Sequence, residues 1–240
     1  MTSSGTVPAF GKSATTFRGP NGEPVVFNEN GDGVVIMAGW TGRSAASVQH
    51  HIDELAAAGV AAPSQVPVFY RVSAGLLTTA DRIEVVGPDT SGEIEVVVME
   101  IGGRRYVGVG SDHTDNKMEA HSVALAKQLC AKVMAPELWN FDDVADHWDQ
   151  LELRAFVTEN GERKLYQQAL LSEFRRPEDM MRRFQERTSL RPSEWLMFCG
   201  ACSAIGGIRP TTAFDIELID PTRSRVVHHA YRAEALPLER

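Results

Sequence analysis

The 240-residue sequence has few cysteines, no long apolar run and fewer basic than acidic residues. No stretch approaches the roughly 20 apolar residues of a membrane-spanning helix, and the first residues show neither the basic nor the apolar region of a secretory signal. The formal net charge of −8 disfavours a nucleic-acid partner, because proteins that bind nucleic acid usually carry a basic excess. We therefore expect a cytoplasmic protein with no membrane or nucleic-acid partner.

Two of the three cysteines form the motif Cys199-Gly-Ala-Cys202, and the third is Cys130. No second C-x-x-C motif completes a four-thiolate zinc site. The apolar residues before Cys199 and the glycines after Cys202 indicate a buried strand that enters a turn, with the thiols acting as small hydrophobic groups. A thiol-redox protein that uses this pair is an alternative function.

The chain has no internal repeat, no G-x-G-x-x-G motif opening a helix and no P-loop, so the nucleotide-binding motifs are absent. Residues 1–33 are predicted to be a hairpin-like segment and residues 34–240 one compact unit. Composition and alternation predict strands at 34–38, 66–72, 94–99, 106–109, 151–158, 163–171, 195–199 and 214–220. Helices are predicted at 44–58, 114–129 and 177–187. The expected fold class is α+β and mostly β.

Glu93 and Glu95 are the most informative residues of the sequence, since they lie two positions apart on a predicted strand. Residues i and i+2 of a strand point to the same face, and two adjacent carboxylates resist joint ionisation. A divalent cation removes that cost, and oxygen ligands favour Mg²⁺, Mn²⁺ or Ca²⁺ over Zn²⁺. Asp112 follows the next strand as a candidate third ligand. The alternative is an exposed strand face with two solvated glutamates.

The predicted helix at 44–58 carries two histidine–carboxylate pairs. His51 and Glu54 lie at i and i+3, as do His50 and Asp53, so each pair shares a helix face. A carboxylate beside an imidazole raises its basicity, which suits a pair that activates water. We favour His51 with Glu54, although an exposed helix with favourable charge pairs would have the same spacing.

The segment from Ser111 to Asp115 lies between a predicted strand and a predicted helix. This is a usual place for a functional loop, and Thr114 or Asp115 would also serve as an ordinary helix cap. Both roles are compatible if Asp112 binds metal and Asp115 caps the helix.

Three cations lie near these motifs in the sequence: Arg43, Arg71 and Lys132. Each has the chemistry to hold a substrate carboxylate or to stabilise an enolate. Taken singly, each is better explained as an ordinary surface charge.

A series of motifs runs in order through residues 34–220. They are Gly39-Trp40, His51-Ile-Asp-Glu54, Pro67-Val-Phe69-Tyr-Arg71-Val-Ser73, Glu93-Ile-Glu95, Ser111-Asp112, Lys132, Asn160-Gly161 with Gln167-Gln168, and Cys199-Gly200-Ala201-Cys202 through Gly206-Gly207. This order resembles that of the fumarylacetoacetate hydrolase superfamily, most closely a bacterial branch of it. The resemblance implies a rolled, barrel-like mixed sheet with a few flanking helices, a homodimer, and a catalytic domain over residues 34–240.

The resemblance also implies the parts of an active site. Mg²⁺ or Mn²⁺ would be held by Glu93, Glu95 and Asp112. The residues expected to act on the substrate are His51 and Glu54 on a lid helix, Lys132 (with Lys127 close by in the sequence) facing the developing negative charge, and Arg43, Arg71, Gly200 and Ala201 on the substrate side. The implied function is a metal-dependent hydrolase that cleaves a C–C bond in a small anionic oxo acid such as an acylpyruvate. Alternatives are a decarboxylase or tautomerase of oxaloacetate-like acids, or a non-catalytic binding protein with this fold.

The sequence departs from the superfamily pattern at several positions. Thr41-Gly42-Arg43 replaces an Asn-Tyr pair, and Arg71, Ser111 and Ala201 stand where lysine, asparagine and threonine are usual. The connection between Glu95 and Asp112 is also shorter and lacks a helix. These changes leave the carboxylates in place and point to an altered substrate.

Overall fold

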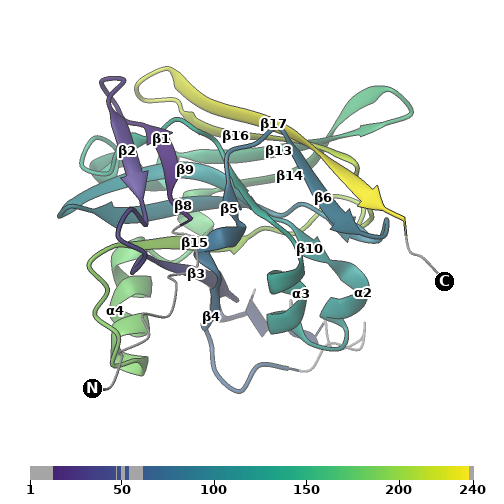
Figure 1. Ribbon diagram of the computed structural model, residues 1–240, viewed down its shortest axis with the longest axis horizontal. Coiled ribbons are helices and arrows are strands. Elements are labelled where there is room, and N and C mark those ends of the chain that lie inside the picture. The colour runs from purple at the N-terminus through teal and green to yellow at the C-terminus, as the bar shows by residue number, and fades with distance from the viewer. Residues whose placement is uncertain (1–12, 47, 50–51, 54–61, 238–240) are drawn as a thin grey trace, which may run out of the picture.

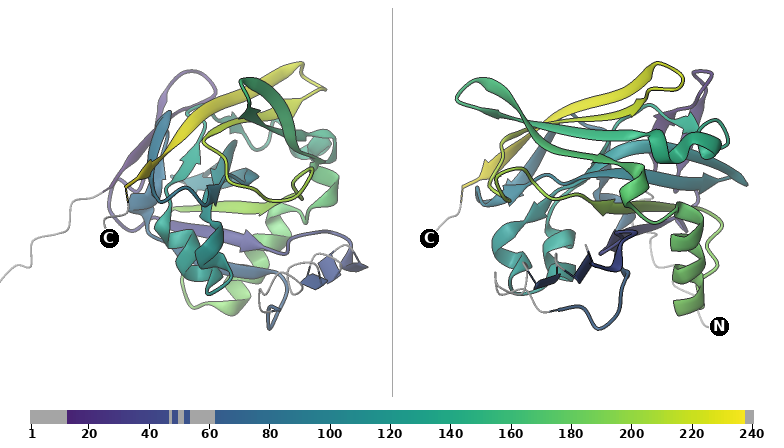
Figure 2. Two further views of the ribbon diagram at one scale, coloured as in Figure 1. Left: turned by 90° about the vertical axis from the view of Figure 1, so that its right-hand side faces the viewer. Right: turned by 180° about the vertical axis from the view of Figure 1, so that it is seen from behind.

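The structure is a computed structural model, and it describes residues 13–46, 48–49, 52–53 and 62–237. Two large sheets lie one over the other, and the helices Asn116–Glu119, Val123–Leu129 and Pro177–Arg187 lie below the lower sheet in Figure 1. The views in Figure 2 show that the sheets are strongly curved, so that they roll around a shared interior. The predicted fold class, α+β and mostly β with a rolled mixed sheet, is confirmed.

The larger sheet contains eight strands. In spatial order they are β4 (Val68–Val72), β3 (Val34–Gly39), β15 (Trp195–Ala201), β8 (Ile94–Ile101), β9 (Arg104–Asp112), β11 (Lys132–Met134) and β5 (Leu77–Thr78), with β12 (Trp139–Asn140) also paired to β9. Strands β15 and β3 are parallel whereas β8 and β9 form an antiparallel hairpin. Gly102 and Gly103 have φ values of 57° and 74° in the turn of that hairpin, which only glycine adopts at little cost.

The smaller sheet contains five strands. In spatial order they are β14 (Glu162–Leu170), β13 (Glu152–Glu159), β16 (Ala213–Asp220), β17 (Arg225–Leu236) and β6 (Arg82–Val86). Asn160 and Gly161 form the turn between β13 and β14 with φ values of 53° and 82°, as a two-residue hairpin loop requires. From the sequence alone, Gly102-Gly103 and Asn160-Gly161 predict hairpin turns, and both hairpins are confirmed.

Strand β8 is buried on both faces, which explains its nearly continuous apolar run. Val96 and Val98 belong to a core cluster shared with the five-stranded sheet. Val97 points the opposite way, into a second cluster under the hairpin of β1 (Thr15–Arg18) and β2 (Pro24–Phe27). The two cores hold β8 rigidly, and the glutamates at its start are fixed with it.

The remaining elements are short. They are β7 (Thr90–Ser91), β10 (Thr114–Asp115), α2 (Asn116–Glu119), α3 (Val123–Leu129), α4 (Pro177–Arg187) and the 3-10 helices η1 (Ala74–Leu76), η2 (Ala145–Gln150) and η3 (Leu171–Glu173). Among the described residues, no helix combines the length and the apolar character that crossing a bilayer requires.

The prediction of one helix over residues 114–129 is wrong. Asp115 caps α2 by accepting a hydrogen bond from the Met118 amide (2.8 Å). Ser122 has an extended backbone (φ −163°) and caps α3 through the Leu125 amide. A serine in that conformation starts a new helix rather than continuing one. By contrast, α4 has the predicted bounds, with Pro177 in its first turn.

Candidate active site

Three carboxylates lie close together at the start of strand β8 and the end of strand β9. Glu93 comes directly before β8, Glu95 lies on it, and Asp112 is the last residue of β9. The hairpin register places Glu95 opposite Gly110, and the Asp112 amide donates to the Glu93 carbonyl at 2.9 Å. One oxygen from each carboxylate lies within 4.8 Å of the others. The register of one hairpin thus assembles a cluster of three oxygen donors.

Two lysines contact this cluster from different sides. The Nζ atom of Lys132 lies 2.7 Å from Asp112 Oδ1 and donates to the His113 carbonyl at 2.7 Å. The Nζ atom of Lys127 binds Asp112 Oδ2 and lies 3.8 Å from Glu93 Oε2. Lys132 is completely buried behind the cluster, whereas Lys127 lines the pocket in front of it. The sequence analysis assigned Lys132 to face the negative charge that develops on the substrate. In the structure, Lys127 rather than Lys132 has the position for that role.

Burial and charge divide the three carboxylates into two kinds. Burial opposes ionisation of Asp112, but Lys127 and Lys132 outweigh it and hold the pKa of Asp112 below its ordinary value. Burial, followed by the charge of Asp112, raises the pKa of Glu95 well above its ordinary value. Burial also raises the pKa of Glu93 to about 7, against the opposing charge of Lys127. Without a metal, Glu95 therefore holds its proton more strongly than Asp112 does.

The shift at Glu93 predicts a pH dependence of stability in chelator-treated protein. Because the folded state holds the proton up to about pH 7, its contribution to stability is lost as the pH rises from about 4.5 to about 7. We expect the wild type to lose up to about 3 kcal/mol relative to Glu93→Gln, which does not titrate there. Urea unfolding of both proteins at several pH values measures this difference. A difference that stays constant with pH would contradict the assignment.

The cluster has the chemistry of a divalent-cation site. Its donors are carboxylate oxygens only, which suit Mg²⁺ and Mn²⁺, and an ammonium group already lies against two of them. Three ionised carboxylates and two lysines leave one net negative charge, which a divalent cation would convert to one net positive charge. The residues therefore fit the metal that the superfamily resemblance implies.

Gly200 fixes the orientation of Glu95. Its amide donates to Glu95 Oε2 at 2.6 Å, and its φ of +103° is one that side-chain-bearing residues rarely adopt. A Cβ atom at this position would also collide with Thr41 Oγ1. Gly200, which the sequence assigned to substrate binding, thus orients a candidate metal ligand, while its neighbour Ala201 lines the pocket.

A buried hydrogen-bond network supports the cluster from the side of the five-stranded sheet. Tyr231 Oη lies 2.8 Å from both Ser111 Oγ and His113 Nδ1. Ser111 Oγ accepts from the Glu93 amide at 3.2 Å, and His113 Nε2 pairs with Thr90 at 2.9 Å. Burial lowers the pKa of His113 to about 3, so His113 is a neutral structural group. The sequence contained no signal for Tyr231, which lies 120 residues from Ser111.

A pocket opens directly in front of the carboxylates. Its lining comes from the end of β3, from α2 and α3, and from the turns after η3 and β15, and consists of Ala38, Gly39, Trp40, Thr41, Gly42, Val48, Tyr70, Glu93, Glu95, Glu119, Val123, Lys127, Glu173, Phe174, Ala201, Cys202, Ser203 and Ile208. Trp40 has a φ of +52°, which is strained for a bulky residue and is typical of ligand sites. Glu93, Glu95 and Lys127 thus share one cavity whose lining is both polar and apolar.

The two arginines expected at the substrate lie elsewhere. Arg43 forms a two-pronged ion pair with Asp149 at 2.8 Å and also donates to the Phe174 carbonyl. Arg71 is exposed on β4 and is not part of the pocket lining. The side chain of Arg43 is thus held by Asp149, and Arg71 lies outside the pocket lining. Neither arginine has the position at the substrate that the sequence analysis expected. His51 and Glu54 lie outside the described residues, and Asp53 accepts from Gln49 at 2.9 Å.

The cysteines do not form a redox pair in the structure. Cys199 is buried and Cys202 half-buried, and both are free thiols. Burial, followed by the charge of Glu173, raises the pKa of Cys202 to about 12, so the reactive thiolate is disfavoured. This agrees with the expectation of buried apolar thiols.

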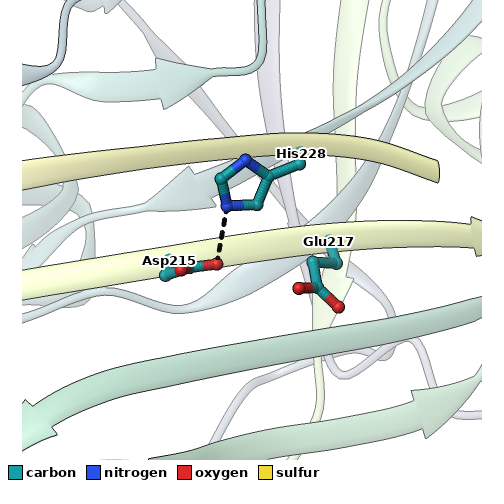
Figure 3. Close-up of side chains that lie close together, drawn as sticks. All are labelled: Asp215, Glu217 and His228. Atoms are coloured by element: carbon teal, nitrogen blue, oxygen red, sulfur yellow. Dashed lines mark hydrogen bonds and ion pairs between the residues drawn. The ribbon is translucent and has the colours of Figure 1, made fainter. Parts of the chain in front are cut away.

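A second group of possible metal ligands lies on the outer face of the five-stranded sheet (Figure 3). Asp215 and Glu217 come from β16 and His228 from β17. Arg163 already binds both carboxylates, at 3.0 Å and 2.7 Å, and His228 is exposed. The arginine satisfies this group, so the interior cluster is the stronger metal candidate.

Comparison with solved structures supports the fold. A protein from Burkholderia cenocepacia, provisionally described as a fumarylpyruvate hydrolase, is similar over 97% of this chain and 96% of its own, with a TM-score of 0.66 and 16% identity. A fumarylacetoacetate hydrolase family protein from Yersinia pestis, also provisionally described, has a TM-score of 0.61 and 16% identity over 91% of this chain and 100% of its own. A 2-keto-3-deoxy-D-arabinonate dehydratase complexed with magnesium and 2,5-dioxopentanoate is similar over 85% of this chain and 74% of its own, with a TM-score of 0.59 and 11% identity.

These similarities show that the chain has the fold of the fumarylacetoacetate hydrolase superfamily, as its motifs implied. The family model described as "Protein of unknown function (DUF2848)" matches residues 38–231, so the chain belongs to that family. No curated protein matches the sequence.

Proposed function

We propose that the protein is a divalent-metal-dependent enzyme that cleaves a C–C bond in a 1,3-dicarbonyl or 2-oxo acid of the acylpyruvate type. The observation that carries this proposal is the cluster of Glu93, Glu95 and Asp112, in which Asp112 binds Lys127 and the two glutamates line one pocket together with that lysine. Proteins of the same fold include a hydrolase, a dehydratase and an isomerase by description, one of them complexed with magnesium and an oxo compound. These neighbours support an enzyme and leave the reaction to be tested.

Each described residue of the site has a distinct part in this proposal. The three carboxylates hold the cation, which when bound supplies a Lewis acid for the substrate carbonyl. Lys127 lines the pocket and binds the cluster, and in this proposal its ammonium group stabilises negative charge that develops on the substrate. Lys132 keeps Asp112 ionised and oriented from behind. His51 and Glu54 remain the proposed pair that deprotonates water.

Decarboxylation or tautomerisation of oxaloacetate-like acids is the second candidate. It uses the same stabilisation of negative charge beside a carbonyl, and the dehydratase and isomerase among proteins of this fold favour it. Fold alone does not choose among these reactions.

Product analysis tests the proposal. Protein loaded with Mg²⁺ or Mn²⁺ is incubated with 2,4-dioxopentanoate and, separately, with oxaloacetate. The proposed hydrolysis adds water to the first compound and gives acetate and pyruvate in equal amounts, with loss of turnover in Asp112→Asn. Pyruvate and CO₂ from oxaloacetate alone would support the second candidate. Metal and ligand binding without turnover of a panel of oxo acids would show a binding protein instead.

A further inference from the structure

One buried phenol group contacts the residues on both sides of a candidate metal ligand. The Oη atom of Tyr231, on β17, lies 2.8 Å from Ser111 Oγ and 2.8 Å from His113 Nδ1. These two residues directly precede and follow Asp112 in the chain, whereas the Asp112 carboxylate itself contacts the two lysines. Tyr231 is only 2% exposed. The phenol group therefore holds the chain on either side of Asp112.

The same phenol group packs against the segment that carries Glu93. A Cβ atom on Gly92 would lie 2.7 Å from Tyr231 Oη, so the backbone directly before Glu93 runs past the phenol oxygen. Ser111 Oγ, which pairs with Tyr231, also accepts from the Glu93 amide at 3.2 Å. Tyr231 thus acts on Glu93 by packing beside it and through Ser111.

Backbone amides around Glu93 are held by side chains from distant parts of the chain. The three consecutive amides at 92–94 donate in turn to side-chain oxygens of Thr211 (3.4 Å), Ser111 (3.2 Å) and Gln167 (3.0 Å). All three acceptors are buried, and a buried amide that loses its acceptor is destabilising. The segment that carries Glu93 therefore has little freedom to shift.

The other two carboxylates are fixed as well. The Gly200 amide donates to Glu95 Oε2 at 2.6 Å. Lys132 lies 2.7 Å from Asp112 Oδ1 and donates at the same distance to the His113 carbonyl. The imidazole of His113 in turn contacts Tyr231. All three candidate ligands are thus set in position by the fold.

A rigid set of few ligands discriminates between divalent cations. Mg²⁺ requires nearly ideal octahedral geometry and keeps several waters, whereas Ca²⁺ accepts more oxygen ligands in an irregular arrangement. Three carboxylates that cannot shift suit the first cation better than the second. Any group that keeps them from shifting therefore contributes to the choice of metal.

We propose that Tyr231 is a positioning residue of the metal centre, and that the hydrogen-bond network around it makes the centre selective for Mg²⁺ or Mn²⁺ over Ca²⁺. This inference rests on the proposed function, because it requires a cation at Glu93, Glu95 and Asp112, and it adds how the chain selects that cation. Tyr231 is not itself one of these ligands and acts through the backbone that carries them.

Titration calorimetry with chelator-treated full-length protein tests this role. Tyr231→Phe removes one oxygen atom and keeps the ring that packs against His113 and Phe214. Mg²⁺ affinity is expected to fall about tenfold, as for other residues that orient metal ligands. Ca²⁺ affinity should fall by less than about threefold, because Ca²⁺ tolerates irregular geometry. The preference for Mg²⁺ over Ca²⁺ should therefore narrow by at least about threefold.

A second variant and a matched control accompany Tyr231→Phe. Ser111→Ala removes the hydroxyl that accepts from the Glu93 amide, and the same narrowing is expected. Tyr106→Phe removes a hydroxyl from another buried tyrosine of β9, which belongs to the second core cluster. This control should leave both cation affinities unchanged.

The possible results separate this inference from the proposed function. Wild-type cation binding with an unchanged preference in both Tyr231→Phe and Ser111→Ala would overturn the inference alone. An equal loss for the two cations, or the same narrowing in Tyr106→Phe, would overturn it too. If the wild type binds no divalent cation, the proposed function fails and this inference fails with it.

Discussion

Replacement of Lys132 by methionine is expected to lower the free energy of unfolding by about 3–5 kcal/mol. Methionine keeps much of the length and volume of the lysine side chain but removes the ammonium group that lies 2.7 Å from Asp112. Both side chains are completely buried, so Asp112 would lose one of its two cations without access to water. Chemical denaturation of chelator-treated wild type and variant measures this loss.

Lys117→Met is the matched control for that experiment. Lys117 also forms an ion pair, with Asp89 at 2.5 Å, but its side chain is 78% exposed. Exposed pairs contribute at most about 1 kcal/mol. A loss in Lys132→Met as small as the loss in the control would show that Lys132 is not the internal partner of Asp112.

Lys127→Met is expected to reduce kcat by about 100- to 1000-fold while divalent-cation binding is retained. Lys127 lines the pocket and contacts Asp112 and Glu93. Its removal takes away a group that stabilises charge on the substrate and also a positive charge that competes with the metal. The cation should therefore bind as tightly as in the wild type or more tightly.

Calorimetry with Mn²⁺ and steady-state kinetics separate these two effects. Lys117→Met again provides the control, with both quantities unchanged. Loss of metal binding together with activity would indicate that Lys127 only holds the cluster together. Unchanged kcat would exclude it from the reaction.

The sequence predicted the hairpins and the carboxylate cluster because both depend on local rules. Gly102-Gly103 and Asn160-Gly161 specify tight turns through their positive φ values. The spacing of Glu93 and Glu95 specifies a shared strand face. The hairpin register then brings Asp112 beside them, since its strand returns antiparallel to β8.

The sequence could not show which of Lys127 and Lys132 lies on the pocket side, because this depends on how the chain turns after Asp115. The break at Ser122 ends one helix and starts the next, and this places Lys127 on the pocket side and Lys132 on strand β11 behind Asp112.

Contacts between residues that are far apart in the sequence could not be predicted either. Arg43 and Asp149 are 106 residues apart and belong to different parts of the fold. Gln167 accepts from the Ile94 amide at 3.0 Å and donates to the Cys202 carbonyl at 2.5 Å, which joins both large sheets beside the site. The sequence showed that this glutamine follows an Asn-Gly turn and belongs to the ordered series of motifs, but not which groups it contacts.

The most direct test of the metal centre is thermal unfolding of chelator-treated wild type and Glu95→Gln, each with and without millimolar Mg²⁺ or Mn²⁺. Burial raises the pKa of Glu95 well above its ordinary value in the metal-free protein. Replacing Glu95 by the uncharged glutamine should therefore cost little stability without metal, and the two proteins should then unfold at similar temperatures. A cation that binds the native state must raise the unfolding midpoint. The proposed centre predicts a rise in the wild type and none in Glu95→Gln, whereas no rise in either protein, or an equal rise in both, would contradict it.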